Sequence, residues 1–267
     1  MFARLLHESG IAYHLQPNDT ARSVFDKAFS FLRKTDFRHE YVYKAALTHK
    51  ILLGTHSLNT ASMLTEFRIG RCKADVVILN GTGTVYEIKS ERDSLSRLER
   101  QIADYRKVFA SVNVIAGEKH IRNVLSTVPE DVGVLELSNR YQIHTRRAAQ
   151  NTPERTDSVS IFDVITSREA GLILTKLGFD LPAVPNTQRY RAYLNIFQDI
   201  APEDAHRSMV SVLKRTRQLK HLAKFVKDLP QSLHSVALST RLSKVEFEML
   251  FQALAMPVQE ARKWADK

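Results

Sequence analysis

The chain has 267 residues, of which 43% are hydrophobic and 25% charged, as is usual for a soluble globular protein of one or two domains. It contains no apolar run of about 18 residues and no apolar stretch near Met1, so we expect a cytoplasmic protein without a membrane span. A single cysteine, Cys72, excludes an internal disulfide and a cysteine zinc cluster. The net charge of +10 favours a polyanionic partner such as nucleic acid.

Helices are predicted in the first part of the chain. Asn18-Asp19-Thr20 is a suitable N-cap for a helix that runs from Ser23 to Arg33, because apolar residues recur there at intervals of three and four. A second helix is expected from Phe37 to Leu53. It should end at Gly54, where glycine can adopt the left-handed conformation of a C-cap.

A β-meander is predicted next. Residues 62–69, 73–79 and 84–89 are short segments rich in β-branched and aromatic side chains. Gly70-Arg71 is short enough for a two-residue hairpin loop, and residues 80–84 supply the second, glycine-containing connection.

Alternating helices and strands follow the meander. An amphipathic helix with apolar residues from Leu95 to Phe109 precedes a buried strand at 112–116, a short helix at 119–127 and a strand at 132–137. The polar segment 150–157 is interpreted as a linker, and the pattern beyond it is helical. We therefore expect an α/β protein with an N-terminal helical arm (1–35), an α/β core (36–150) and a C-terminal helical domain (153–267).

Three acidic residues interrupt the apolar strands of the meander. If both turns are regular, Glu66 lies opposite Asp75, and Asp75 lies opposite Glu87, so all three carboxylates share one face of the sheet with Lys89. Two like charges about 4 Å apart repel by about 4 kcal/mol at an effective dielectric near 20. One lysine does not offset three carboxylates, whereas a divalent cation does. The row therefore predicts a metal site.

Asp75 followed by Glu87-Ile88-Lys89, in a helix–meander–helix–strand context, resembles the PD-(D/E)XK nuclease superfamily. The stretch from Thr65 to Gly81 is similar to an uncharacterised group of bacterial and phage proteins in it, although Ala74 stands in the place of the eponymous proline. The resemblance covers about residues 36–117. It implies a restriction-endonuclease-like mixed sheet flanked by helices, and hydrolysis of phosphodiester bonds with Mg²⁺ or Mn²⁺. It also implies that Asp75 and Glu87 bind the metal and that Lys89 is the catalytic lysine.

Further residues extend this candidate site. Glu40 is placed where many superfamily members have an additional metal ligand, although it could instead pair with Lys44 one helical turn away. Gln101-x-x-x-Tyr105 is similar to an element of RecB-like nucleases. Gln101 is the functional candidate of the two, and Tyr105 is expected to pack in the core. Arg97 could contact a phosphate, and Glu66 could complete the metal site.

A basic amphipathic helix is predicted between Arg207 and Lys227, a segment without acidic residues. It could contact a nucleic-acid backbone, be only a solvated face, or lie on a membrane surface. The expected nucleic-acid ligands there are Lys214, Arg215, Arg217, Lys220 and Lys224. The predicted function is metal-dependent hydrolysis of DNA, with DNA favoured over RNA. The alternatives are a non-cleaving nucleic-acid-binding protein, such as a phage or mobile-element accessory factor, and a protein-interaction factor that uses its C-terminal helices.

Overall fold

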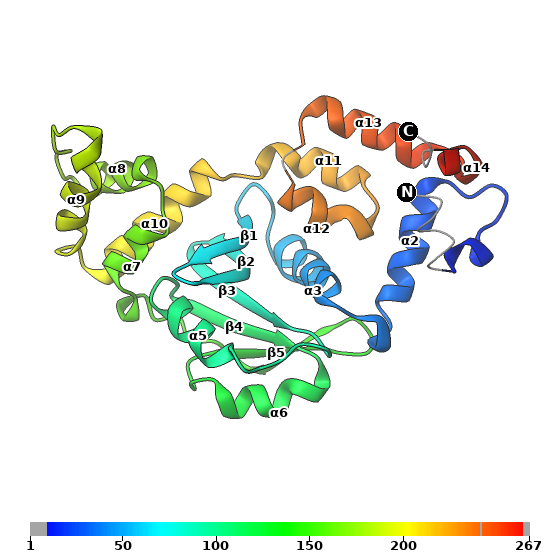
Figure 1. Cartoon of the computed structure of the whole chain (residues 1–267), viewed down its shortest axis with the longest axis horizontal. Coiled ribbons are helices and arrows are strands. Elements are labelled where there is room, and N and C mark those ends of the chain that lie inside the picture. The colour runs from blue at the N-terminus through cyan, green and yellow to red at the C-terminus, as the bar shows by residue number, and fades with distance from the viewer. Residues whose placement is uncertain (1–9, 241, 264–267) are drawn as a thin grey trace.

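The computed structural model describes residues 10–240 and 242–263 and has a mixed six-stranded sheet at its centre (Figure 1). The first three strands are antiparallel, β3 to β5 run parallel, and β6 is antiparallel to β5. Helices cover both faces, which confirms the predicted α/β class with a mixed sheet flanked by helices. The strands, in sheet order, are β1 (Ser62–Ile69), β2 (Cys72–Asn80), β3 (Thr82–Lys89), β4 (Ser111–Ala116), β5 (Gly133–Leu137) and β6 (Ile143–Arg147).

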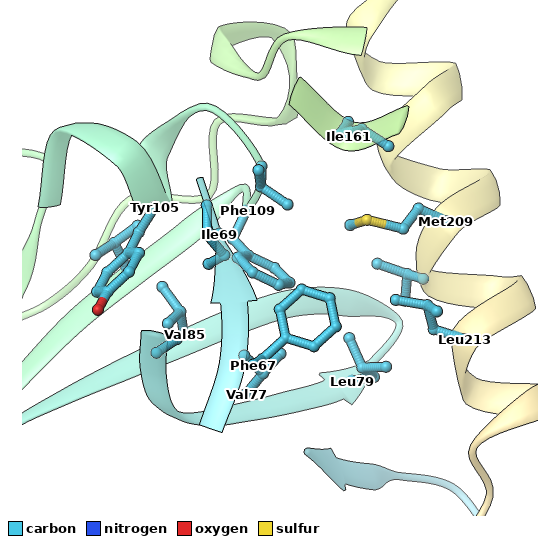
Figure 2. Packing of buried hydrophobic residues seen from close by; sticks show 14 of the residues in the cluster. Phe67, Ile69, Val77, Leu79, Val85, Tyr105, Phe109, Ile161, Met209 and Leu213 are labelled. Carbon is cyan, nitrogen blue, oxygen red and sulfur yellow. The ribbon is translucent and has the colours of Figure 1, made fainter. Parts of the chain in front are cut away.

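One hydrophobic cluster fills the first face of the sheet. Met209 and Leu213 of the long helix α10 point at Phe67 and Leu79 of the meander, while Tyr105 approaches from the other side (Figure 2). Buried side chains of this cluster come from helices both before and after residue 153. The helices on this face are α5 (Leu98–Arg106), α6 (Glu118–Thr127), α7 (Ser158–Asp163), α8 (Ser167–Lys176), α9 (Asn186–Phe197) and α10 (Pro202–Thr216).

A second cluster covers the opposite face, and it joins the N-terminal helices to the last part of the chain. The helices after residue 153 are thus divided between the two faces of the sheet, and the predicted division into three domains stays a prediction. No helix within residues 10–240 and 242–263 has the length and apolar character needed to cross a membrane. The helices that contribute to this cluster are α2 (Ala21–Leu32), α3 (Glu40–Leu47), the π-helix η3 (Thr48–Leu52), α4 (Leu53–Thr55), α11 (Ala223–Asp228), α12 (Gln231–Ser239) and α13 (Lys244–Ala255). The short helix α14 (Val258–Ala261) packs against α2 in a smaller cluster. The 3-10 turns of the chain, as far as the structure describes it, are η1 (Ile11–His14), η2 (Thr35–Phe37), η4 (Pro153–Arg155) and η5 (Lys220–Leu222).

Most predicted elements are confirmed, some with shifted ends. Strand 62–69 has the predicted bounds, and the predicted N-cap holds because the Thr20 side chain accepts a hydrogen bond from the Ser23 N–H. The second meander connection is tighter than expected, since Asn80 pairs with Thr82 around Gly81 alone. β6 was not predicted, because its exposed, polar sequence has no apolar alternation.

The helix expected from Phe37 to Leu53 is different in the structure. It begins at Glu40 and changes to a π-helix at Thr48. Gly54 is not a left-handed C-cap, since it lies within α4 and is not among the glycines with positive φ. A Cβ atom at this position would come within 2.9 Å of the His49 carbonyl oxygen. The glycine therefore provides space for the wide turn of the π-helix.

The prediction of a single basic helix between Arg207 and Lys227 is also wrong. α10 ends at Thr216, and the chain turns before η5 and α11. Arg217, the first residue after α10, donates two hydrogen bonds to Glu169, from Nε at 2.9 Å and from Nη2 at 2.8 Å, and its guanidinium lies 5.4 Å from the ring centroid of Phe67. These contacts hold Arg217 against α8 and β1.

We expect Glu169→Gln to lower the free energy of unfolding by about 2 kcal/mol at pH 7, a value reduced for the partial exposure of Arg217. Burial acts to raise the pKa of Glu169, but hydrogen bonds from Arg217 and Thr166 outweigh it and lower the pKa to about 2. Because this lies below the value of about 4.3 for an unfolded glutamate, the stabilisation is present above that pH and is lost as the pH falls toward 2.

Urea unfolding at pH 7 and at about pH 3.5 tests this, with the exposed Glu130→Gln as the matched control. The difference in the free energy of unfolding between wild type and Glu169→Gln should be smaller at the lower pH. An equal effect of both variants at pH 7 would contradict the assigned role of the ion pair.

Candidate functional site

A cleft of about 470 Å³ lies at one end of the meander. The β1–β2 hairpin, the end of β3, the first turn of α3 and the N-terminal part of α5 form its walls. It brings together most of the residues that the sequence singled out, and the lining residues are Glu40, Glu66, Arg68, Arg71, Cys72, Lys73, Asp75, Glu87, Ile88, Lys89, Asp93, Ser94, Arg97, Arg100 and Gln101.

The strand registers agree with the sequence arithmetic, but the predicted row of charges is divided. Phe67 pairs with Ala74, and Val76 pairs with Tyr86, as the two hairpins require. Glu66 interrupts its strand with a positive φ of 53°, a backbone conformation that is rare and costly outside glycine. Asp75, directly across, pairs with neither neighbouring strand and instead uses its carboxylate as an acceptor.

The charged residues form two groups in the structure, and the first group contains three carboxylates. Glu40, Glu66 and Asp75 each present one carboxylate oxygen, and these three oxygens lie within 4.8 Å of one another. Lys44 contacts two of the three, with Nζ 2.5 Å from Glu40 and 2.6 Å from Glu66. The hydrogen bond from Lys44 lowers the pKa of Glu66. The position of Glu40 is therefore compatible with both predicted roles, as an ion-pair partner of Lys44 and as a metal ligand.

Among these three carboxylates, the ionised form of Asp75 is the most strongly disfavoured. Its Oδ2 accepts a hydrogen bond of 2.7 Å from the backbone N–H of Ile88. Burial, followed by the neighbouring carboxylates of Glu87 and Glu40, nevertheless raises the pKa of Asp75 to about 8. Lys44 acts in the opposite direction but does not outweigh them, so the charge of Asp75 is incompletely compensated, which is the electrostatic condition that favours binding of a divalent ion.

The second group surrounds Glu87 and Lys89, which are both buried. Glu87 accepts from Lys89 Nζ at 2.8 Å, from Gln101 Nε2 at 2.6 Å and from the Tyr105 hydroxyl at 2.8 Å. Lys89 Nζ also donates to the Gln101 Oε1 at 2.9 Å. Gln101 therefore lies beside Glu87 and Lys89, within the candidate site. Glu87 itself is surrounded by donors and stands outside the group of three carboxylates.

Tyr105 was expected only to pack in the core, and it does so while it also holds Glu87. Its hydroxyl donates to the carboxylate and approaches the Lys73 carbonyl oxygen at 2.8 Å. Burial and Glu87 both raise the pKa of Tyr105, so the hydroxyl stays a donor at neutral pH. The signal for this role was its spacing of four residues from Gln101, which places both side chains on one side of α5.

We expect Tyr105→Phe to lower the free energy of unfolding by about 1–3 kcal/mol, because a buried carboxylate oxygen then lacks a donor. The matched control is Tyr190→Phe, which removes a hydroxyl 2.9 Å from the Asp163 carboxylate on an exposed side chain. That variant should change stability by less than about 0.5 kcal/mol. Urea denaturation of both variants measures the difference, and equal values would contradict the role of Tyr105.

Cationic side chains surround the acidic group. Arg97 was predicted to be near the site and does line the cleft, while Arg68 of β1, Arg71 of the hairpin turn and Arg100 of α5 were not singled out. None of the C-terminal candidates Lys214, Arg215, Lys220 and Lys224 lines this cleft, and Arg217 is bound to Glu169. The exposed cations that line it are Arg68, Arg71, Lys73, Arg97 and Arg100.

Comparison with known proteins identifies relatives of the chain. Protein cII of Enterobacteria phage P4 is 33% identical over 84 residues, which are 31% of this chain and 32% of that protein, so the chain aligns with about a third of its relative. The SPO1766 protein of unknown function from Silicibacter pomeroyi is 19% identical over 53% of this chain and 79% of its own, with a TM-score of 0.29, too low to establish a common fold. The family model of bacteriophage P4 protein cII matches residues 33–239, well over half of the sequence. The chain therefore belongs to the bacteriophage P4 protein cII family.

Proposed function

We propose that this protein is a metal-dependent nuclease that hydrolyses phosphodiester bonds in DNA, with a core of the restriction-endonuclease type. The observation that carries the proposal is the occurrence of a carboxylate group, a buried lysine and a border of arginines in one cleft. Carboxylates alone are common on protein surfaces, and so are arginines. Their combination matches a reaction in which a phosphate must be held beside a divalent ion.

The donor set suits Mg²⁺ or Mn²⁺. Both ions prefer carboxylate oxygens supplemented by water and phosphate oxygens. Glu40, Glu66 and Asp75 would hold the ion, and Glu87 is near enough to Asp75 to raise its pKa. The ion would polarise the scissile phosphate and lower the pKa of a nearby water.

The other side chains of the cleft have separate roles. Glu87 and Gln101 fix the ammonium group of Lys89 at the end of β3, where it can orient an attacking water or balance negative charge on the phosphate. Arg97 and Arg100 are exposed at the start of α5 and can bind phosphates that flank the reacting one. Tyr105 keeps Glu87 in position from the core.

A second candidate function is nucleic-acid binding without cleavage. It is favoured by Lys44, which already forms ion pairs with two of the three carboxylates as in a structural ion network. Such a protein would bind DNA equally well in EDTA, and Asp75→Asn would not change its affinity.

A cleavage assay distinguishes these functions. Supercoiled plasmid, linear duplex, single-stranded DNA and RNA are incubated with wild-type protein in Mg²⁺, Mn²⁺ or EDTA. We expect cutting of DNA with either metal and none in EDTA. If no DNA is cut with either metal while binding persists, the second function replaces the first.

A further inference from the structure

A second groove, of about 760 Å³, follows the outer edge of β1. In the described part of the chain β1 pairs only with β2, so this is an open edge of the sheet. The segment that joins α10 to α11 passes along this edge and forms the opposite wall, together with the end of α12 (Figure 1). Six consecutive residues of β1, from Met63 to Arg68, line the groove.

The groove is continuous with the candidate site. Glu66 and Arg68 line both the groove and the cleft. Glu66 is the residue whose positive φ interrupts β1, and it is also one of the three clustered carboxylates. A polymer that enters the cleft can therefore extend past Arg68 along β1.

The chemistry of the groove fits a single strand better than a duplex. Leu64, Leu219 and Leu242, all half-buried, give it an apolar surface, and Arg68 and His221 add exposed basic side chains. Glu66, at the junction with the cleft, is the one acidic residue among the lining residues that the structure describes. A duplex hides its base faces and presents phosphates, whereas an unpaired strand presents both phosphates and bases.

We infer that this groove binds a single-stranded segment of nucleic acid whose continuation reaches the candidate site. The inference rests on the proposed function and specifies its substrate as DNA with an unpaired strand or a frayed end. Two cations on the wall-forming elements, the half-buried Lys214 of α10 and the exposed Lys220 of η5, add attraction for the backbone without lining the groove. An extended peptide could also add to the edge of β1, but the exposed Arg68 and His221, together with continuity with the cleft, favour a polyanion.

The test is fluorescence anisotropy with a labelled 20-nucleotide single strand and a blunt hairpin duplex, measured in EDTA so that hydrolysis plays no part. The groove variant is Gln218→Glu/His221→Glu, which adds two negative charges at exposed lining positions. The matched control is Gln142→Glu/His144→Glu, the same exchange at exposed positions beside and within β6, the opposite edge of the sheet. We expect the groove variant to weaken single-strand binding about tenfold and the control to change it less than twofold.

Unchanged single-strand affinity in the groove variant, equal losses in the two variants, or an equal loss for the duplex would each overturn the inference and leave the β1 edge for a peptide partner. The outcome is separable from that of the proposed function. Groove-dependent binding by a protein that cuts nothing would refute the nuclease alone. Metal-dependent cutting by a protein whose single-strand binding ignores the groove would refute the groove alone.

Discussion

Lys89→Ala is expected to lower the rate of DNA cleavage about 10²- to 10³-fold and to leave metal affinity nearly unchanged. Lys89 contacts Glu87 and Gln101, and it stands outside the group Glu40, Glu66 and Asp75 that is proposed to hold the ion. Its removal therefore takes away charge at the reacting phosphate without removing a metal ligand. Single-turnover cleavage of plasmid with saturating Mg²⁺ measures the rate.

Two further variants make this result interpretable. Lys119→Ala removes an exposed lysine from α6, outside the cleft, and should keep the wild-type rate. Lys89→Arg retains the positive charge at a buried position and should recover part of the activity if charge is what matters. A wild-type rate in folded Lys89→Ala would show that the lysine has no part in the reaction.

The affinity of the cleft for Mg²⁺ is expected to increase about tenfold per pH unit between pH 6 and 8 and to level off above. The pKa of Asp75 is raised to about 8, so this group holds its proton through most of that range in the metal-free protein. Binding requires the carboxylate form, and each bound ion must therefore displace one proton. As the pH increases through 8, that cost disappears.

Calorimetry in two buffers of different ionisation enthalpy measures both the affinity and the number of protons released. Near pH 7 we expect release of about one proton per ion. Glu130→Gln serves as the control because it removes an exposed carboxylate elsewhere on the surface. An affinity that is independent of pH between 6 and 8 would mean that Asp75 is not a ligand.

The meander and its registers could be predicted from the sequence because local rules determine them. Gly70-Arg71 allows a tight hairpin, and Gly81 at φ 70° allows the second turn, so the partner of each residue follows by counting. The same counting placed Asp75 between Glu66 and Glu87. Gln101 was singled out by the resemblance of Gln101-x-x-x-Tyr105 to an element of RecB-like nucleases, and it contacts Lys89 in the structure.

Other features depend on contacts between distant segments, and sequence patterns do not contain these. Lys89, Gln101 and Tyr105 donate to Glu87, so the predicted row became an acidic group and a separate Glu87 network. Lys44 reaches Glu66 across the gap between α3 and β1. The sequence predicts Arg217 to be a free basic residue, but in the structure it forms an ion pair with Glu169. The amphipathic patterns of the C-terminal helices likewise do not indicate which face of the sheet each helix covers.

The most direct test of the central claim combines Mn²⁺ binding, measured by electron paramagnetic resonance, with cleavage of supercoiled plasmid in the same samples of wild type and Asp75→Asn. We predict that wild type binds Mn²⁺ and cuts the plasmid, and that Asp75→Asn binds the ion at least tenfold more weakly and cuts at a rate reduced by roughly 10² or more. Cutting by Asp75→Asn at the wild-type rate, or cutting by wild type in EDTA, would contradict this prediction.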